Sequence, residues 1–276
     1  MNVKIVADSS ANLPALAGVS YASVPLKIVT DEKEYVDDAA LNTEEMVCDL
    51  EAYKGRSGTA CPSVGDWLEA FGDAQYVFTV AITSNLSGSH NAALQAKDMY
   101  EEQYPDRRVT CLDSLSTGPE MVLIAERLVE LIDAGLDFDT VSEQIREYMK
   151  KTHLLFSLES MDNLAKNGRV SKVAAKAAGI LGIRIVGKAS DVGTLQQLHK
   201  CRGEKKALYT MLEEMVAHGF TGGKVRIAHG LNENGARALL DVIRSTYPNI
   251  EATIVPFGGL CCFYAERGGL MVGFEG

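Results

Sequence analysis

The sequence has little proline and no long apolar run. Only 7 prolines occur among 276 residues, and hydrophobic residues make up 46% of the chain. A disordered protein is therefore excluded, because this composition is that of an ordinary globular protein. No stretch approaches the roughly 20 consecutive apolar residues that a membrane span needs. The residues from Met1 to Ser10 lead straight into a strand-like run rather than a signal peptide. We therefore expect a cytoplasmic protein without stable membrane insertion.

Positive charge is also scarce. Lys and Arg total 27 against 37 Asp and Glu, which gives a formal net charge of -10. An acidic surface repels phosphodiester backbones, so we expect no nucleic-acid partner. The basic residues between 166 and 188 are interpreted as a solvated helix face, with Arg169 as one arginine that could serve a ligand.

Motifs for metals, nucleotides and common hydrolases are missing. The six cysteines form no C-x-x-C pair and no finger-like spacing, and the five histidines form no H-E-x-x-H motif. There is no G-x-x-x-x-G-K-[ST] loop, no G-x-G-x-x-G and no G-x-S-x-G. We therefore expect free thiols, no metal, no cofactor and no ATP binding by a phosphate loop.

What the sequence does contain is an alternation of β-rich runs and amphipathic helical runs. Such alternation is typical of an α/β protein with mainly parallel sheets and flanking helices. The pattern begins again near His153, so we predict two α/β domains, at residues 1–152 and 153–276. Strands are expected near residues 3–7, 22–29, 76–82, 109–112, 153–158, 183–188, 194–199, 224–229 and 250–256. Helices are expected near residues 43–54 and 62–71, after residue 89 to about residue 104, from about residue 118, near 138–151, as a short helix carrying residues 164–170, and near 204–218 and 233–246.

Candidate binding residues lie in turns that follow strands, since open α/β sheets bind ligands beyond the carboxyl ends of their strands. The segment 84–89 follows a buried strand and opens a helix, where free N–H groups and the helix dipole attract anions. Within it, Ser87 adds a hydroxyl and Gly88 allows close approach to the backbone. Thr59 precedes a proline that starts a helix, and Arg169 follows a glycine. The alternatives are plain helix caps for the hydroxyls and a surface role for the arginine.

Spacing alone supports an anion-binding α/β protein. An enzyme that uses Ser87 as a nucleophile on a small acyl or anionic substrate is the alternative, but it lacks a placed base. His90 lies three residues after Ser87, on the following helix, and is interpreted as a surface or packing residue.

The same residues carry a resemblance to the DegV family, which extends over essentially the whole chain. The motifs that resemble the family's pattern are D-S-S-A-N-L at residues 8–13, V-P-L at 24–26, Y-V-D-D at 35–38, T-A-C-P-S at 59–63, S-G-S at 87–89, N-L-A-K-N-G-R-V-S at 163–171, K-C-R-G-E-K-K-A at 200–207 and G-G-L-M-V-G-F at 268–274. Their collinear order makes the resemblance specific.

The resemblance implies a carrier that holds a long-chain fatty acid between two α/β domains and has no catalytic site of its own. It implies a separate ATP-dependent fatty acid kinase subunit as the partner. Thr59, Ser87 and Gly88 are implied as carboxylate-binding residues, with Arg169 nearby. The second domain would contribute the acyl tunnel, for which small residues between 174 and 179 leave room; a tightly packed helix is the other interpretation of that segment.

The chain departs from the family in places. Ala60 and Cys61 replace polar residues, and Tyr264 stands where relatives have a histidine. A tyrosine donates a hydrogen bond but is not a base at neutral pH. We expect Tyr264 to bind the ligand or a neighbouring hydroxyl, to narrow the entrance, or to fill the core. An interaction protein with an unused pocket is a further alternative.

Overall fold

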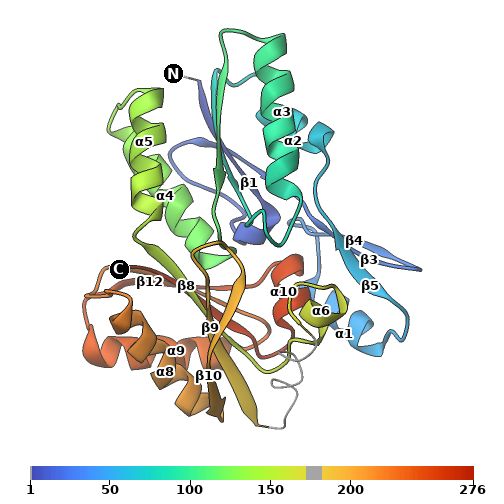
Figure 1. Ribbon diagram of the computed structural model, residues 1–276, viewed down its shortest axis with the longest axis vertical. Helices are drawn as coiled ribbons and strands as arrows, with labels where there is room; N and C mark the ends of the chain where they lie inside the picture. The colour runs from blue at the N-terminus through green and yellow to red at the C-terminus, as the bar shows by residue number, and fades with distance from the viewer. Residues whose placement is uncertain (1, 172–181) are drawn as a thin grey trace.

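The computed structural model describes residues 2–171 and 182–276 of the chain. Its two larger sheets lie one above the other in Figure 1, with helices on their outer faces and a smaller sheet at one side. The predicted α/β class is confirmed. The arrangement places the carboxyl ends of the first sheet's strands against a face of the second sheet.

The first sheet is parallel and is built only from strands of the N-terminal half. Its order is β2-β1-β6-β7, and all its neighbouring pairs are parallel. The strands are β1 (Val3–Asp8), β2 (Ser20–Val24), β6 (Tyr76–Ala81) and β7 (Arg108–Asp113). Strand β6 is apolar apart from Thr79, as expected of a buried parallel strand with helices on both faces of its sheet.

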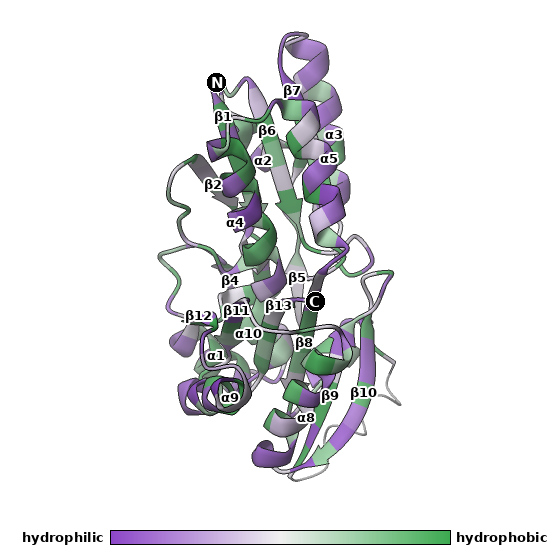
Figure 2. Cartoon of the chain, turned by 90° about the vertical axis from the view of Figure 1, so that its left-hand side faces the viewer, coloured by the Kyte–Doolittle hydropathy of each residue, from purple (hydrophilic) through white to green (hydrophobic). Residues whose placement is uncertain are grey.

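Side-chain alternation along these strands divides the packing between two helix layers. On one face, Val6 and Val77 pack with α2 (Val64–Phe71) and α3 (Ser89–Gln103). On the other, Ile5 and Phe78 pack with α4 (Pro119–Asp133) and α5 (Phe138–Met149). Figure 2 shows the resulting concentration of hydrophobic residues on β6. The apolar layers hold the loops at the carboxyl ends of the strands in fixed positions.

The second sheet differs from the prediction of a mainly parallel sheet. Its order is β10-β9-β8-β13-β11-β12, and among the described strands only the β11–β12 pair is parallel. The strands are β8 (Thr152–Leu158), β9 (Ile183–Ala189), β10 (Leu195–Arg202), β11 (Lys224–His229), β12 (Glu251–Pro256) and β13 (Leu270–Glu275).

Two long-range features cause this difference. Strands β9 and β10 are joined by a short turn, which forces an antiparallel pair. Strand β13, which the alternation of strands and helices did not predict, enters antiparallel between β8 and β11. Neither pairing direction is encoded in the periodicity of a single segment.

A third, antiparallel sheet of three short strands was also not predicted. It has the order β4-β3-β5 and consists of β3 (Lys27–Thr30), β4 (Glu34–Val36) and β5 (Ser57–Ala60). The single strand expected at 22–29 is two strands, because Pro25 interrupts the run between β2 and β3. Strand β5 brings Thr59 to the middle of the molecule.

Helices from both halves of the chain cover the two faces of the second sheet. On the outer face lie α8 (Glu204–Ala217) and α9 (Glu233–Thr246). The inner face meets α4, α1 (Thr43–Ala52) and α10 (Gly259–Ala265), with α6 (Asp162–Lys166) beside them. Helix α10 was not predicted from sequence. No helix in the described ranges is long and apolar enough to cross a membrane.

The strands of the two larger sheets fall on either side of residue 152. One apolar cluster nevertheless joins Ile28 and Met46 of the N-terminal half to Phe156 and Phe263. The division of the chain into domains at 1–152 and 153–276 stays a prediction.

Candidate functional site

A cavity of about 160 Å³ lies where the loops of the first sheet meet the inner face of the second. Its polar end contains every predicted site residue: Thr59, Ser87, Gly88, Arg169 and Tyr264. The remainder is lined by apolar side chains, chiefly Leu26, Ile82, Leu86, Leu154, Phe156, Leu158, Leu164, Leu195, Leu260, Ala265 and Met271. Residues distant in the sequence therefore form one amphipathic cavity.

The start of helix α3 lies at the polar end of this cavity. Gly88 is its N-cap residue and supplies no side-chain hydrogen bond to the first turn. Ser87 Oγ accepts a hydrogen bond of 3.2 Å from the N–H of Ser89. Neither Ser87 nor Ser89 is therefore the N-cap residue, although Ser87 accepts one backbone hydrogen bond where the helix begins. The dipole of this 15-residue helix also favours an anion at its N-terminus.

A side chain at Gly88 would be tightly packed against Cys61. A Cβ atom at this position would lie 3.2 Å from Cys61 Sγ, closer than side chains ordinarily pack. Gly88 and Cys61 are both exposed, so this end of the cavity reaches the protein surface.

The loop that carries Ser87 is held at both ends by Asp8. The Asp8 carboxylate accepts hydrogen bonds from the N–H of Ile82 at 2.9 Å and from Ser89 Oγ at 2.7 Å. It also accepts a bond of 2.5 Å from Ser10 Oγ. Burial raises the pKa of Asp8, while these bonds act in the opposite direction. In the sequence, Asp8 is the first residue of the D-S-S-A-N-L motif, and nothing there predicted its contact with the loop of Ser87.

Thr59 and Tyr264 form a hydroxyl pair across the cavity mouth. Their oxygens are 2.7 Å apart, although Thr59 lies on β5 and Tyr264 on α10. Burial raises the pKa of the Tyr264 phenol, an effect that Thr59 and Arg169 partly offset. The phenol therefore stays protonated at neutral pH. Tyr264 also packs against two apolar clusters, so the expected bond to a neighbouring hydroxyl and the core-filling role are both observed.

Helix α10, which carries Tyr264, is oriented by a buried carboxylate. Asp37 accepts hydrogen bonds from the N–H groups of Gly259 at 2.5 Å and Leu260 at 3.0 Å. Asn12 accepts another from the N–H of Gly258 at 2.7 Å. Burial raises the pKa of Asp37, and the bonds from Leu260 and Gly259 oppose the shift. The sequence signal for Asp37 was present in the Y-V-D-D motif, but its contact lay more than 200 residues away.

Arg169 connects the segment after α6 to the loop of Ser87. Its Nε donates to the carbonyl of Leu86 at 3.3 Å, and its Nη1 donates to the carbonyl of Asn167 at 2.5 Å. The guanidinium carbon lies 5.7 Å from the centre of the Tyr264 ring. A fixed positive charge is thus held beside the hydroxyl pair. The small residues between 174 and 179, predicted to make room for an acyl chain, lie outside the described residues.

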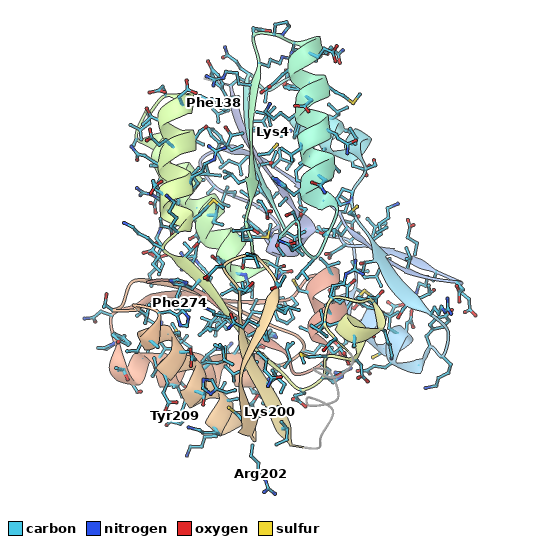
Figure 3. All side chains as sticks on the ribbon, viewed as in Figure 1. Lys4, Phe138, Lys200, Arg202, Tyr209 and Phe274 are labelled. Atoms are coloured by element: carbon cyan, nitrogen blue, oxygen red, sulfur yellow. The ribbon has the colours of Figure 1, made fainter. Side chains whose placement is uncertain are left out.

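The basic motif at 200–207, K-C-R-G-E-K-K-A, begins at the far end of a strand that reaches the cavity. Leu195, at the start of β10, lines the cavity, whereas Lys200 and Arg202 are exposed at the other end of the same strand. Figure 3 shows Arg202 projecting from the end of the molecule. The resemblance to the family therefore includes residues outside this cavity.

The cavity combines hydrogen-bond donors at one end with an apolar lining along the rest. Within residues 2–171 and 182–276, no group of three or more His, Cys, Asp or Glu side chains could hold a metal. Burial raises the pKa of Cys261 and of Cys262 to about 12, so both stay as thiols. In the described part of the chain, no hydrogen bond joins Ser87 to a histidine, and burial lowers the pKa of His90. The arrangement offers donors for a carboxylate and an apolar wall for a chain.

Comparison with known proteins gives a consistent result over the whole chain. A family model described as an uncharacterised protein of the DegV family matches residues 2–275. A DegV domain-containing protein of Streptococcus pneumoniae is 46% identical over 279 residues, which covers 100% of this chain and 99% of the relative.

Two solved structures share the fold closely. One is a DegV family protein from Eubacterium eligens loaded with heptadecanoic acid, with a TM-score of 0.97, 45% identity and 99% of each chain covered. The other is the fatty acid kinase (Fak) B3 protein of Streptococcus pneumoniae loaded with linoleic acid. It also has a TM-score of 0.97 and 45% identity, covering 100% of this chain and 99% of its own.

Proposed function

The chain belongs to the DegV family, and from that premise we propose that it is a carrier that binds a long-chain fatty acid. The carboxylate is held at the polar end of the cavity and the acyl chain lies along its apolar wall. The observation that carries this proposal is the division of one cavity into a hydroxyl-bearing end and a wall of leucines and other apolar side chains. Two structures with 45% identity contain a fatty acid.

The energetics of the cavity suit such a ligand. Burial of an acyl chain contributes about 0.8 kcal/mol per methylene. A carboxylate that leaves water must be met by hydrogen bonds, because an unpaired buried charge is very costly. Ser87 and the N-terminus of α3 supply donors on one side. Arg169 supplies positive charge on the other.

We assign the hydroxyl pair a direct part in carboxylate binding. Thr59 and Tyr264 have one hydroxyl hydrogen each, and the 2.7 Å bond between them uses only one of the two. The second hydrogen is available to a ligand oxygen. Tyrosine thus replaces the histidine of the family's pattern as a donor, although not as a base. Gly88 lets the carboxylate approach the helix backbone.

A carrier of this kind presents its ligand and performs no catalysis itself. The exposed positions of Gly88 and Cys61 put the polar end of the cavity at the surface, where another protein can reach the carboxylate. We propose a separate ATP-dependent kinase subunit as that protein, in line with the name of the S. pneumoniae neighbour. The cytoplasmic location and the two-domain division belong to the same proposal.

Lipid extraction of the purified protein followed by mass spectrometry tests the proposal. We expect a long-chain fatty acid in near-stoichiometric amount, released by denaturation without any covalent attachment. A protein that carries no lipid and does not bind added fatty acid would contradict the carrier function. An enzyme using Ser87 as a nucleophile would instead show an acyl adduct by intact mass, absent in Ser87→Ala.

A further inference from the structure

A row of three residues crosses the cavity face of the second sheet. Phe156 on β8 lies directly opposite Gly187 on β9 and directly opposite Met271 on β13. Residues opposite one another in neighbouring strands point to the same face of a sheet. Phe156 and Met271 line the cavity, whereas Gly187 does not reach it. Where these three residues cross the sheet, the cavity wall is formed by the Phe156 ring and Met271, and Gly187 lies beside the ring.

The Phe156 ring occupies the space that a side chain at Gly187 would need. A Cβ atom on Gly187 would lie 2.4 Å from Cζ and 2.6 Å from Cε2 of Phe156. It would also lie 2.5 Å from the carbonyl oxygen of Gln196 on β10, an edge strand. Gly187 is not among the glycines with positive φ, so the backbone conformation does not require glycine here. The requirement is space, and the ring takes much of it.

The Phe156 ring forms part of the cavity wall. Because the ring extends over Gly187, it lies along the sheet instead of standing up from it. Phe156 is only 2% exposed and packs with Leu154, Leu158 and Leu164 in one apolar cluster. A side chain at position 187 would displace the ring towards the cavity, since the sheet backbone blocks movement in the opposite direction.

We infer that Phe156, laid over Gly187, is the specificity-determining wall of the acyl cavity. The pair sets how much of a long chain the protein buries and leaves carboxylate binding to the polar end. The inference rests on the proposed function and adds the residues that select among fatty acids. The substrate class that it implies is acyl chains long enough to reach past this ring.

The test is a binding series with decanoic, tetradecanoic and octadecanoic acids on delipidated protein. Wild type is compared with Gly187→Ala, Phe156→Leu and the double variant. Each methylene that loses burial lowers affinity about fourfold. We expect Gly187→Ala to lower the affinity for octadecanoic acid by roughly tenfold or more and the affinity for decanoic acid by less than about twofold. In the double variant, Phe156→Leu removes the ring atoms that clash with the new Cβ atom, so much of the affinity for octadecanoic acid should be restored.

Two controls keep the outcomes separate. Gly65→Ala, an exposed glycine of α2 whose added Cβ would meet only Ser63 Oγ at 3.6 Å, should leave the whole series unchanged. If circular dichroism shows that Gly187→Ala does not fold, the single variant Phe156→Leu tests the inference. It should then raise the affinity for bent cis-octadecenoic acid relative to decanoic acid.

The inference is overturned if every variant keeps the chain-length dependence of the wild type while still binding fatty acid. It is equally overturned if the substitutions lower the affinity for acids of every chain length by one common factor. Phe156 and Gly187 would then act on the polar end of the cavity or on folding. Failure of the wild type to bind any of the acids is a different result, which refutes the proposed function itself.

Discussion

The polar end of the cavity depends on a few hydroxyl groups supplied by distant parts of the chain. Ser87 comes from the loop after β6, Thr59 from β5 and Tyr264 from α10. Ser87 has one hydroxyl hydrogen to donate, and the Thr59–Tyr264 pair has one beyond the bond between its two oxygens, so losing a hydroxyl from the position that faces the carboxylate removes a partner. The cost is large because the ligand is charged and partly removed from water.

Ser87→Ala and Thr59→Ala should each weaken fatty-acid binding by about 1.5–3 kcal/mol, the usual worth of a hydrogen bond to a charged group. Competition with a fluorescent fatty acid measures the loss. Ser245→Ala, which removes an exposed hydroxyl on α9, is the matched control and should bind like wild type. Wild-type affinity in the double variant Ser87→Ala, Thr59→Ala would mean that the carboxylate is held elsewhere.

Tyr264 has a polar role and a packing role that different substitutions separate. Tyr264→Phe removes only the hydroxyl and should weaken binding by about 1 kcal/mol, the typical net worth of a neutral hydrogen bond. Tyr264→Ala also removes the ring that packs against two apolar clusters, so it should change chain-length preference and lower stability. Unchanged affinity in Tyr264→Phe would leave the ring as the only contribution.

At the scale of elements, the short helix α10 shows how a local structure is fixed from outside. It has seven residues and no side-chain cap of its own. Asp37 and Asn12, both from the N-terminal half, accept the hydrogen bonds of its first turn. The orientation of Tyr264 therefore depends on a carboxylate that is far away in sequence.

Asp37→Asn tests this dependence. The amide would direct an N–H group at one of the backbone N–H groups of Gly259 and Leu260, so we expect a loss of roughly 1–3 kcal/mol in the free energy of unfolding and weaker fatty-acid binding. Urea denaturation and ligand competition measure the two effects. Asp38→Asn changes the adjacent carboxylate, which is exposed and accepts only a local bond from Ala40, and should have little effect. Equal effects of the two substitutions would contradict this role of Asp37.

Helix α4 connects the two larger sheets at the scale of the whole molecule. It covers one face of the first sheet with α5 and contacts β8, β11 and β13 of the second. Near its start, Glu120 is buried and accepts a hydrogen bond of 2.8 Å from Thr152 of β8. Burial raises the pKa of Glu120 to about 7 from an ordinary value of 4.5, and the bond from Thr152 acts in the opposite direction.

This shift makes stability depend on pH in a defined direction. Between pH 4.5 and about 7 the folded protein keeps a proton on Glu120 that the unfolded chain has released. Stability therefore falls as the pH rises through this window, by at most about 3 kcal/mol. Urea denaturation at a series of pH values measures the slope, and Glu120→Gln should reduce it.

The exposed residue Glu143 of α5 provides the control for this prediction. Glu143→Gln should keep the pH dependence of the wild type. Parallel slopes for Glu120→Gln and wild type would show that Glu120 does not titrate in this window, and other buried carboxylates such as Asp8 and Asp37 would then account for any slope.

The sequence determined the elements whose signals are local. The strands expected at 76–82 and 153–158 and the helix that follows the S-G-S motif all correspond to observed structure. The motifs also identified the family, which the match over residues 2–275 confirms. They named Thr59, Ser87, Gly88, Arg169 and Tyr264, which line one cavity, and their role in binding stays a prediction.

Only the tertiary structure decided how these pieces meet. The antiparallel entry of β13, the three-stranded sheet that carries Thr59, and the capping of α10 by Asp37 each join segments far apart in the chain. The placement of Phe156 over Gly187 depends on the pairing of β8 with β9. Periodicity and capping residues act within a few turns or strands. Pairing direction and cavity shape instead depend on long-range packing, which no single segment of the sequence specifies.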